Sequence, residues 1–165
     1  MIKISVKILF MPTEEYPKLV RVLQNVMDVK ENEIQSTTKS FTKFRTESTS
    51  ESTAESTTKE ENNYLVIESS GLASLRKFYE GIRTQKIVQA ARRFLMKKMD
   101  ATGVSFMLHK QGMFMGKFHF CDDPYDSPMG PVWVRIDSDN IQRLLEYLTP
   151  ETKNGIPLEV DYIPE

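Results

Sequence analysis

The segment IKISVKILF, at residues 2–10, decides the expected fold. Its apolar side chains recur at every second position, namely Ile2, Ile4, Val6, Ile8 and Phe10. Lys3, Ser5 and Lys7 occupy positions between them. A period of two is that of a β-strand, in which successive side chains point to opposite faces of the sheet. The segment therefore predicts a strand with one face buried.

A helix is expected directly after this strand. Pro12 opens a turn, Thr13 supplies a hydroxyl that can cap the helix, and Glu14 and Glu15 suit the positive end of the helix dipole. Apolar residues then follow at helical spacing: Leu19, Val20, Leu23, Val26 and Met27. The chain therefore opens with a strand and a helix.

Similar patterns continue along the chain. They predict strands at residues 64–67, 104–108, 114–120 and 132–136. They also predict two more helical regions, one at residues 72–99 with a break near Gly81 and one at residues 138–148. Lys110, Gln111 and Gly112 are few enough for a hairpin turn. Runs of strands joined by short turns indicate an α+β fold, a two-layer sandwich in which an antiparallel or mixed sheet carries helices on one face.

Residues 36–60 differ from the rest of the chain, because fourteen of these twenty-five residues are Ser or Thr. Such a segment cannot bury enough apolar surface to offset the entropy of ordering it. Residues 36–62 are therefore expected to be a low-complexity insert, either a solvated loop or a hairpin that projects from the sheet. We expect residues 46–60 to be dispensable for stability. The expected order is β-α-β-β-α-β-β-β-α, in a single domain over residues 1–165.

The composition excludes several classes of protein. The chain has 165 residues with 22 Lys and Arg and 23 Asp and Glu, so it is not a uniformly basic nucleic-acid coat. Cys121 is the only cysteine, which excludes an intrachain disulfide framework and fits a reducing cytosol. No run approaches the roughly 18 apolar residues of a membrane span. We therefore expect a soluble, cytoplasmic, unprocessed protein without a membrane partner.

The near-neutral total hides a segregation of charge. Residues 72–120 hold 10 basic and 2 acidic side chains, which gives a net charge of +8. Residues 121–165 hold 3 basic and 10 acidic side chains, which gives −7. A basic block beside an acidic one bears on the partners of the protein rather than on its fold.

One helix carries a row of cations within the basic block. At about 100 degrees per residue, four basic side chains share a narrow stripe: Arg83, Lys86, Arg93 and Lys97. No acidic residue lies between Glu80 and Asp100, so the row has no ion-pair partner within its own helix. A linear row of cations suits RNA, because each neutralised phosphate releases condensed counterions. The row could instead be a solvated face or pair with the acidic C-terminal third.

Two further features are candidate contacts. Lys110 and Gln111 lie at the predicted hairpin tip, where a ligand can reach a cation and an amide. Trp133 and Arg135 occupy alternate positions of the last predicted strand, pointing away from its inward-facing apolar residues. An exposed Trp beside an Arg can stack a base. We nevertheless expect Trp133 to pack under a helix.

Catalytic and metal sites are not indicated. His119, Cys121 and Asp123 share one face of a predicted strand, but one strand supplies too few ligands for a closed zinc site. Two extended strands around the hairpin would place His109 more than about 20 Å from His119. The chain has no phosphate-binding Gly-rich motif and no common hydrolase motif. We expect no catalytic residue, no metal, no cofactor and no enzymatic activity.

Three motifs in register resemble those of one archaeal family. Residues 82–92 read IRTQKIVQAAR and resemble the pattern I-R-x-Q-R-x-L-D-A-A-R. Residues 108–117 read LHKQGMFMGK and resemble L-N-K-Q-A-A-F-V-G-K, and residues 127–131 read SPMGP and resemble S-P-L-G-P. The family comprises small proteins that are assigned to RNA binding by inference and linked by gene neighbourhood to the exosome. The resemblance spans residues 82–150 well and the first strand and helix loosely.

The resemblance implies a fold like that of the large-subunit ribosomal protein that binds 5S rRNA, and it implies RNA binding. Gln89 and His109 depart from the pattern, which has Asp and Asn at these places. We expect a non-enzymatic RNA-binding protein associated with the exosome or the ribosome. The alternative is a protein-interaction or homodimeric subunit whose basic helix docks an acidic partner surface. The expected RNA-binding residues are Arg83, Lys86, Arg93, Lys97, Lys110 and Gln111.

Overall fold

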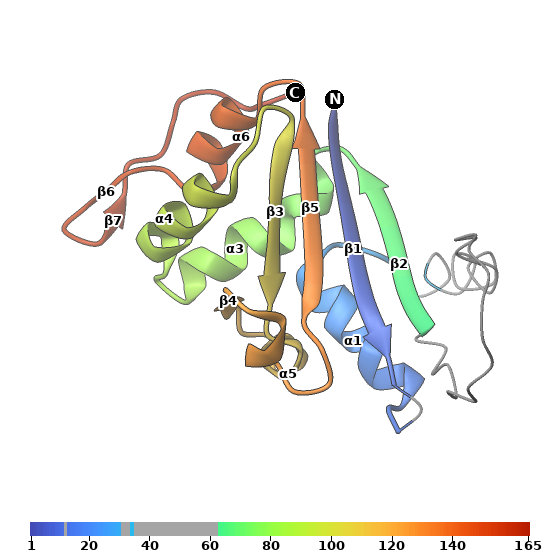
Figure 1. The fold of residues 1–165 in the computed structure, drawn as a ribbon. Helices are drawn as coiled ribbons and strands as arrows, with labels where there is room; N and C mark the ends of the chain where they lie inside the picture. The colour runs from blue at the N-terminus through green and yellow to red at the C-terminus, as the bar shows by residue number, and fades with distance from the viewer. Residues whose placement is uncertain (12, 31–33, 35–62) are drawn as a thin grey trace, which may run out of the picture.

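The computed structural model describes residues 1–11, 13–30, 34 and 63–165, which form an α+β two-layer sandwich (Figure 1). One layer is a five-stranded antiparallel sheet in the order β2-β1-β5-β3-β4. Its strands are β1 (Ile2–Phe10), β2 (Asn63–Ser70), β3 (Gly103–Leu108), β4 (Phe120–Cys121) and β5 (Val132–Ser138). The predicted fold class is confirmed. The predictions for the Ser/Thr-rich insert at residues 36–62 lie outside the described residues.

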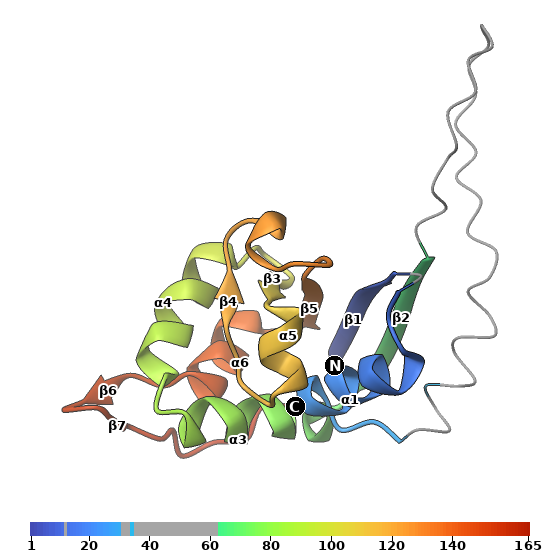
Figure 2. The ribbon, with the colours of Figure 1, turned by 90° about the horizontal axis from the view of Figure 1, so that it is seen from below.

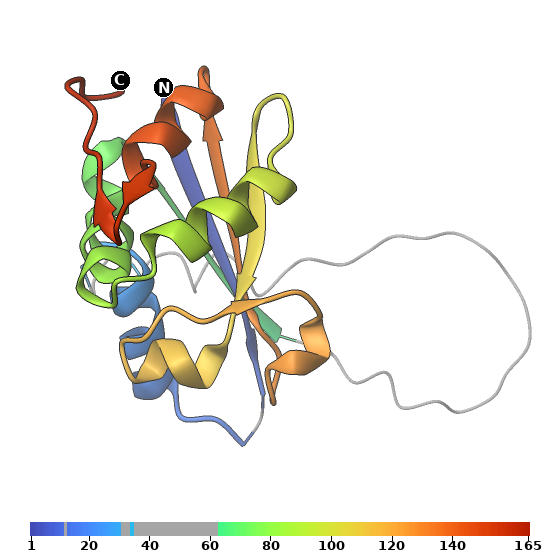
Figure 3. The same ribbon diagram turned by 90° about the vertical axis from the view of Figure 1, so that its left-hand side faces the viewer.

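The other layer consists of helices on one side of the sheet (Figure 3). Its helices are α1 (Tyr16–Val26), α3 (Arg76–Thr84), α4 (Val88–Lys98) and α6 (Ile141–Leu148). The connections contain the short helix α5 (Lys110–Phe114) and the 3-10 turns η1 (Leu72–Leu75) and η2 (Pro124–Asp126). A hairpin of β6 (Thr152–Lys153) and β7 (Ile156–Pro157) projects from the body of the protein (Figure 2). None of the described helices is long and apolar enough to cross a bilayer.

β1 has the alternation that its sequence predicts. Ile4, Val6 and Ile8 are at most 2% exposed, whereas Lys3 and Lys7 are exposed. The buried side chains belong to the core between the sheet and the helices. On the other side of the sheet, no helix in the described part of the chain covers the strands (Figure 3). Among the residues that the structure describes, the sheet therefore has one face that the helices bury and one open face.

The helical region predicted over residues 72–99 is broken at Lys86, whereas α3 runs through Gly81, so the predicted position of the break is wrong. The Ile87 amide donates to the Ile82 carbonyl at 2.9 Å, and the Lys86 amide donates to the Arg83 carbonyl at 3.0 Å. These bonds form a Schellman motif, in which the residue after the helix is left-handed. Lys86 takes this conformation with φ of 58°. Glycine usually holds this position because it has no Cβ, so the sequence lacked the usual signal for a break at Lys86.

The hairpin predicted at residues 110–112 is also wrong, because these residues begin α5. His109 caps this helix by accepting at Nδ1 a hydrogen bond from a first-turn amide at 3.1 Å. At the other end, Asn25 of α1 donates from Nδ2 to the Met113 carbonyl at 2.8 Å. The chain coils here instead of running straight. The strand predicted over residues 114–120 is thereby reduced to the short β4.

The last predicted helix is confirmed as α6. Its apolar stripe is buried in the core and comprises Ile141, Leu144, Leu145 and Leu148. Asn140 caps the helix, because its Oδ1 accepts a hydrogen bond from the Arg143 amide at 3.0 Å. Gln142 lies off the stripe and is exposed. One face of α6 therefore holds this helix on the sheet.

Leu145→Ala should lower the free energy of unfolding by about 2 to 5 kcal/mol, because it leaves a cavity in the core. Gln142→Ala changes an exposed residue of the same helix and should shift this free energy by less than about 0.5 kcal/mol. Chemical denaturation of both variants measures the difference. Equal midpoints would contradict the packing of α6 on the sheet.

Lys86→Gly should raise the free energy of unfolding by about 1 kcal/mol, because glycine takes the left-handed conformation without the steric cost that a Cβ brings. Lys86→Ala is the matched control, since it removes the same charge and keeps the Cβ. We expect its unfolding midpoint in denaturant to stay near that of the unaltered chain. Equal gains in the two variants would assign the effect to charge and contradict the strain.

Candidate nucleic-acid interface

The structure distributes the predicted RNA-binding residues over three helices and the turn between α3 and α4. The six residues are Arg83, Lys86, Arg93, Lys97, Lys110 and Gln111. The first lies near the end of α3 and the second just after it, the next two lie on α4, and the last two open α5. The prediction of a continuous stripe along one helix is therefore wrong, because α3 and α4 are separate helices.

Arg83 is engaged in contacts within the protein. Its side chain is 17% exposed. Its guanidinium donates to the Leu148 carbonyl at 3.0 Å and to the Glu159 carboxylate at 2.8 Å, and it lies 3.4 Å from the centroid of the Tyr79 ring. The hydrogen bond from Arg83 holds the pKa of Glu159 below its usual range. These contacts tie α3 to α6 and to the C-terminal tail.

Lys110 is also engaged internally and does not lie at an accessible tip. Its side chain is 7% exposed. The Nζ donates to the Leu9 carbonyl at 2.7 Å, the Met129 carbonyl at 2.8 Å and the Glu14 carboxylate at 3.0 Å. Burial lowers the pKa of Lys110, and its bond with Glu14 opposes that shift. The neighbouring Gln111 is exposed.

The SPMGP motif at residues 127–131 completes the arrangement around Lys110. The Ser127 Oγ accepts a hydrogen bond from the Lys110 amide at 3.0 Å and donates one to the Gly130 carbonyl at 3.0 Å. Met129 and Gly130 bend the loop with φ of 65° and 87°. Two of the three motifs that carry the family resemblance therefore meet at one packed corner, where their contacts are internal.

Lys86, Arg93 and Lys97 are the cations of the predicted set that stay available to a ligand. All three are exposed, and none forms an ion pair within the described residues. Their neighbours Arg92 and Lys98 on α4 instead face acidic residues, in ion pairs at 3.8 and 3.6 Å. Arg93 and Lys97 are four residues apart, so they share one helix face about 6 Å apart along the axis. Two cations without acidic partners therefore project together from α4.

The open face of the sheet carries two aromatic rings. The centroids of Tyr64 on β2 and Trp133 on β5 are 5.9 Å apart, with an angle of 65° between the rings. Lys7 lies between them on β1, and its ammonium is 4.1 Å from the Tyr64 centroid and 5.3 Å from the Trp133 centroid. The expectation that Trp133 packs under a helix is therefore wrong. Its alternation with the buried Val132 and Val134 was the sequence signal for this position.

Arg135, on the same open face, is held by two carboxylates. Its Nη1 donates to Asp100 at 2.5 Å and its Nε donates to Asp137 at 2.7 Å. The hydrogen bond from Arg135 holds the pKa of Asp100 well below its usual range. The guanidinium is therefore fixed in place and its charge is balanced, which leaves Lys7 as the cation beside the rings.

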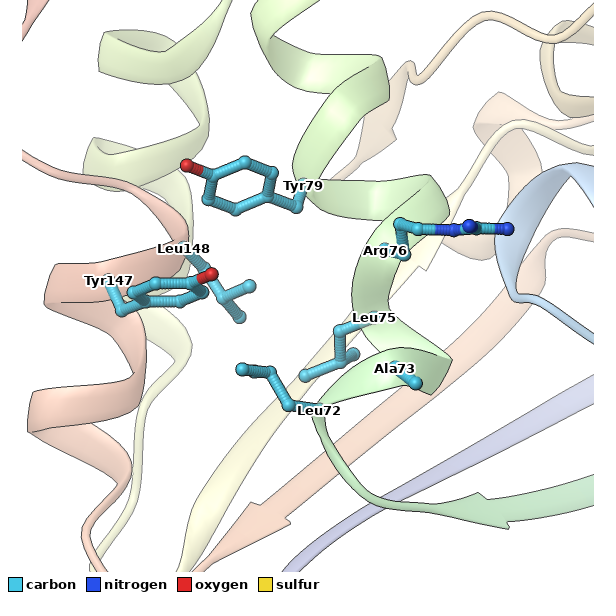
Figure 4. Close-up of a pocket in the computed structure, with 7 residues that line it drawn as sticks. All are labelled: Leu72, Ala73, Leu75, Arg76, Tyr79, Tyr147 and Leu148. Carbon is cyan, nitrogen blue, oxygen red and sulfur yellow. The ribbon is translucent and has the colours of Figure 1, made fainter. Parts of the chain in front are cut away.

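A crevice with a volume of ≈ 220 Å³ lies between η1, α3 and α6 (Figure 4). Its lining is mainly apolar and comprises Leu72, Ala73, Leu75, Arg76, Tyr79, Tyr147 and Leu148. The rings of Tyr79 and Tyr147 stack with centroids 5.2 Å apart, and Arg76 is paired with Asp28 at 2.5 Å. Pockets for drug-sized ligands are larger, roughly 300 to 1,000 Å³, and add a few converging polar groups. The crevice is therefore a packing feature of the helix layer.

His109 and His119 lie close together, contrary to the predicted separation of more than about 20 Å. Their ring centroids are 5.5 Å apart, and the His109 amide donates to the His119 carbonyl at 2.8 Å. The prediction failed because the intervening residues coil into α5. Across the described ranges, no group of three or more His, Cys, Asp or Glu side chains is placed to hold a metal ion.

Comparison of the sequence with known proteins indicates a family. A family model described as RNA binding matches residues 3–138, which span all five strands of the main sheet except Ile2 at the start of β1. A UPF0201 protein of Sulfurisphaera tokodaii is 32% identical over 167 residues, which cover 99% of this chain and 98% of that protein. A UPF0201 protein of Sulfolobus acidocaldarius is 41% identical over 100 residues, which cover 61% of this chain and 69% of that protein.

Solved structures agree with the fold. A UPF0201 protein from Methanococcus jannaschii has a TM-score of 0.66 at 22% identity, and the match covers 95% of this chain and 99% of that one. Mth689, a DUF54 protein from Methanothermobacter thermautotrophicus, has a TM-score of 0.50 at 15% identity, over 89% of this chain and 91% of that one. At such identities the likeness concerns the fold alone. By its sequence matches, the chain belongs to the archaeal UPF0201 family, for which the matching family model is described as RNA binding.

Proposed function

We propose that this chain is a non-enzymatic RNA-binding module that contacts phosphates through Lys86, Arg93 and Lys97. The proposal depends on one observation, the two exposed cations on one face of α4 that have no acidic partner among the described residues. A cation that is already paired with a carboxylate must lose that partner before it can bind a phosphate. Arg93 and Lys97 have no such partner to lose. The description of the matching family as RNA binding supports RNA as the ligand.

Contacts of this kind recognise charge and shape rather than base sequence. Each phosphate that a cation neutralises releases counterions, which gives affinity without base readout. The exposed Gln111 is a further polar contact in this proposal. Arg83 and Lys110 take an indirect part, because they hold the tail and the loops in place while their charges are balanced inside the protein.

The motif resemblance supports a cellular setting for this activity. We infer an association with the exosome or the ribosome, because the resembling family is linked to the exosome by gene neighbourhood. The resemblance also implies a fold like that of the ribosomal protein that binds 5S rRNA, which supports the ribosome as the other setting. Both settings supply structured RNA beside other proteins.

The segregation of charge favours a second candidate function, that of a protein-interaction or homodimeric subunit. Residues 72–120 carry a net charge of +8 and residues 121–165 carry −7. The basic helix of one copy could therefore dock the acidic surface of a second copy or of another partner. Such a complex would also weaken with salt, but it would form without RNA.

The double variant Arg93→Ala/Lys97→Ala should weaken RNA binding and leave the domain folded. On single-stranded RNA, the slope of log affinity against log salt should become shallower by about 0.7 for each phosphate that the variant no longer neutralises. Anisotropy of a labelled RNA at several salt concentrations measures the slope, and circular dichroism checks the fold.

A matched control is the double variant Lys18→Ala/Lys77→Ala, which removes the same charge from α1 and α3. It should keep the salt slope of the unaltered chain. An equal weakening in the two double variants would mean that overall charge, rather than α4, binds RNA. Self-association in low salt without RNA, abolished in Arg93→Ala/Lys97→Ala, would support the assembly subunit instead.

A further inference from the structure

The open face of the sheet presents a row of side chains that the phosphate proposal does not use. The strand register aligns Val66, Lys7, Trp133 and Met107 across β2, β1, β5 and β3. Because neighbouring strands lie about 4.8 Å apart, the row spans about 14 Å. Tyr64 lies next to the row, and its ring packs against the Trp133 ring in a T-shaped arrangement. The result is a short strip that combines two aromatic rings with one cation.

A polar row of the sheet bounds this strip on one side, whereas Leu9 pairs with Tyr64 on the other side. The polar row consists of Glu68, Ser5, Arg135 and Ser105. Arg135 is fixed there by its carboxylate partners. A stable protein interface buries about 800 Å² on each partner around an apolar centre. The strip is too narrow to supply such a centre, and its size suits a small planar group.

The strip also offers the two interactions that an unpaired nucleotide makes. Aromatic rings stack on nucleobases of any sequence, because every base has a π-face. The Lys7 ammonium lies over the ring of Tyr64 at 4.1 Å and near that of Trp133 at 5.3 Å. Its flexible four-carbon stem allows it to leave the rings and to meet a phosphate beside a stacked base. The charge on the strip is small, which suits bases better than a long phosphate track.

We infer that this face binds unpaired bases of single-stranded RNA, with Trp133 and Tyr64 as stacking surfaces and Lys7 as the cation that turns to the adjoining phosphate. The inference rests on the proposed RNA binding and names the form of RNA that the protein takes. Double-stranded RNA does not fit, because its bases stack on one another inside the duplex. The site lies on the opposite layer from Arg93 and Lys97, so each can be altered separately.

Trp133 is the only tryptophan of the chain, so its fluorescence reports on this site alone. Titration of the full chain with a single-stranded oligouridylate should quench the Trp133 emission as a base stacks on the ring. A duplex RNA of equal length should bind, by anisotropy, without this quenching. Inorganic polyphosphate should likewise leave the emission unchanged, because it has no bases.

Tyr64→Ala should weaken binding of a labelled oligouridylate by about 5- to 150-fold, the effect of removing one stacked base. Tyr125→Ala is the matched control, because Tyr125 is 94% exposed on η2 and is outside the strip. The Tyr125→Ala variant should bind the oligouridylate with the same affinity as the unaltered chain. Circular dichroism of both variants establishes that the fold is kept.

The outcomes separate this inference from the proposed function. Unchanged Trp133 emission and an unchanged Tyr64→Ala affinity would overturn the stacking site, even where Arg93→Ala/Lys97→Ala still weakens RNA binding. Quenching at saturating RNA that survives Arg93→Ala/Lys97→Ala would support the stacking site. An unchanged RNA affinity of that double variant would contradict the phosphate surface on α4 and leave the stacking site standing. Emission that changes with protein concentration but not with RNA would show that a second copy covers the face, and it would overturn the inference. Absence of binding to any RNA would overturn both.

Discussion

Burial of a single face of the antiparallel sheet is the constraint on which the other features depend. Because side chains alternate across a strand, a helix layer on one side assigns each strand residue either to the core or to the open surface. Ile4 and Val6 on β1 are buried by this rule. The same rule places Lys7, Tyr64 and Trp133 together on the open side, although they are far apart in the sequence. A second helix layer would have made these rings part of a core.

Elements that one continuous stretch of sequence defines could be predicted, and elements that depend on distant contacts could not. The strand at Ile2–Phe10 and the helix at Ile141–Leu148 follow from periods of 2 and 3.6 residues. The position of the break after α3 was hidden, because Lys86 takes a conformation that glycine usually marks. α5 was hidden because Lys110 is held by the Leu9 carbonyl, 101 residues earlier in the chain.

The same distinction applies to the candidate site. Helical spacing shows which cations share a face, but it does not show which of them are already paired. Arg83 meets Glu159, 76 residues later, whereas Arg93 and Lys97 meet no acid among the described residues. For Trp133, the alternation of β5 was visible, but which face the helices would cover depends on the whole sheet. Because the two proposed surfaces lie on opposite layers and share no residue, their contributions to affinity should be nearly additive.

The corner around Lys110 affects how function should be inferred across relatives. Lys110 and Ser127 belong to two of the most recognisable motifs of the chain, yet their polar groups bind backbone carbonyls, a backbone amide and Glu14. In this structure these residues fix the geometry of the loops, a role that does not require a particular ligand. Sharing these two motifs is therefore evidence for the architecture of this corner and not for a particular RNA or partner. These motifs therefore indicate a shared fold, and ligand specificity depends on the surfaces outside them.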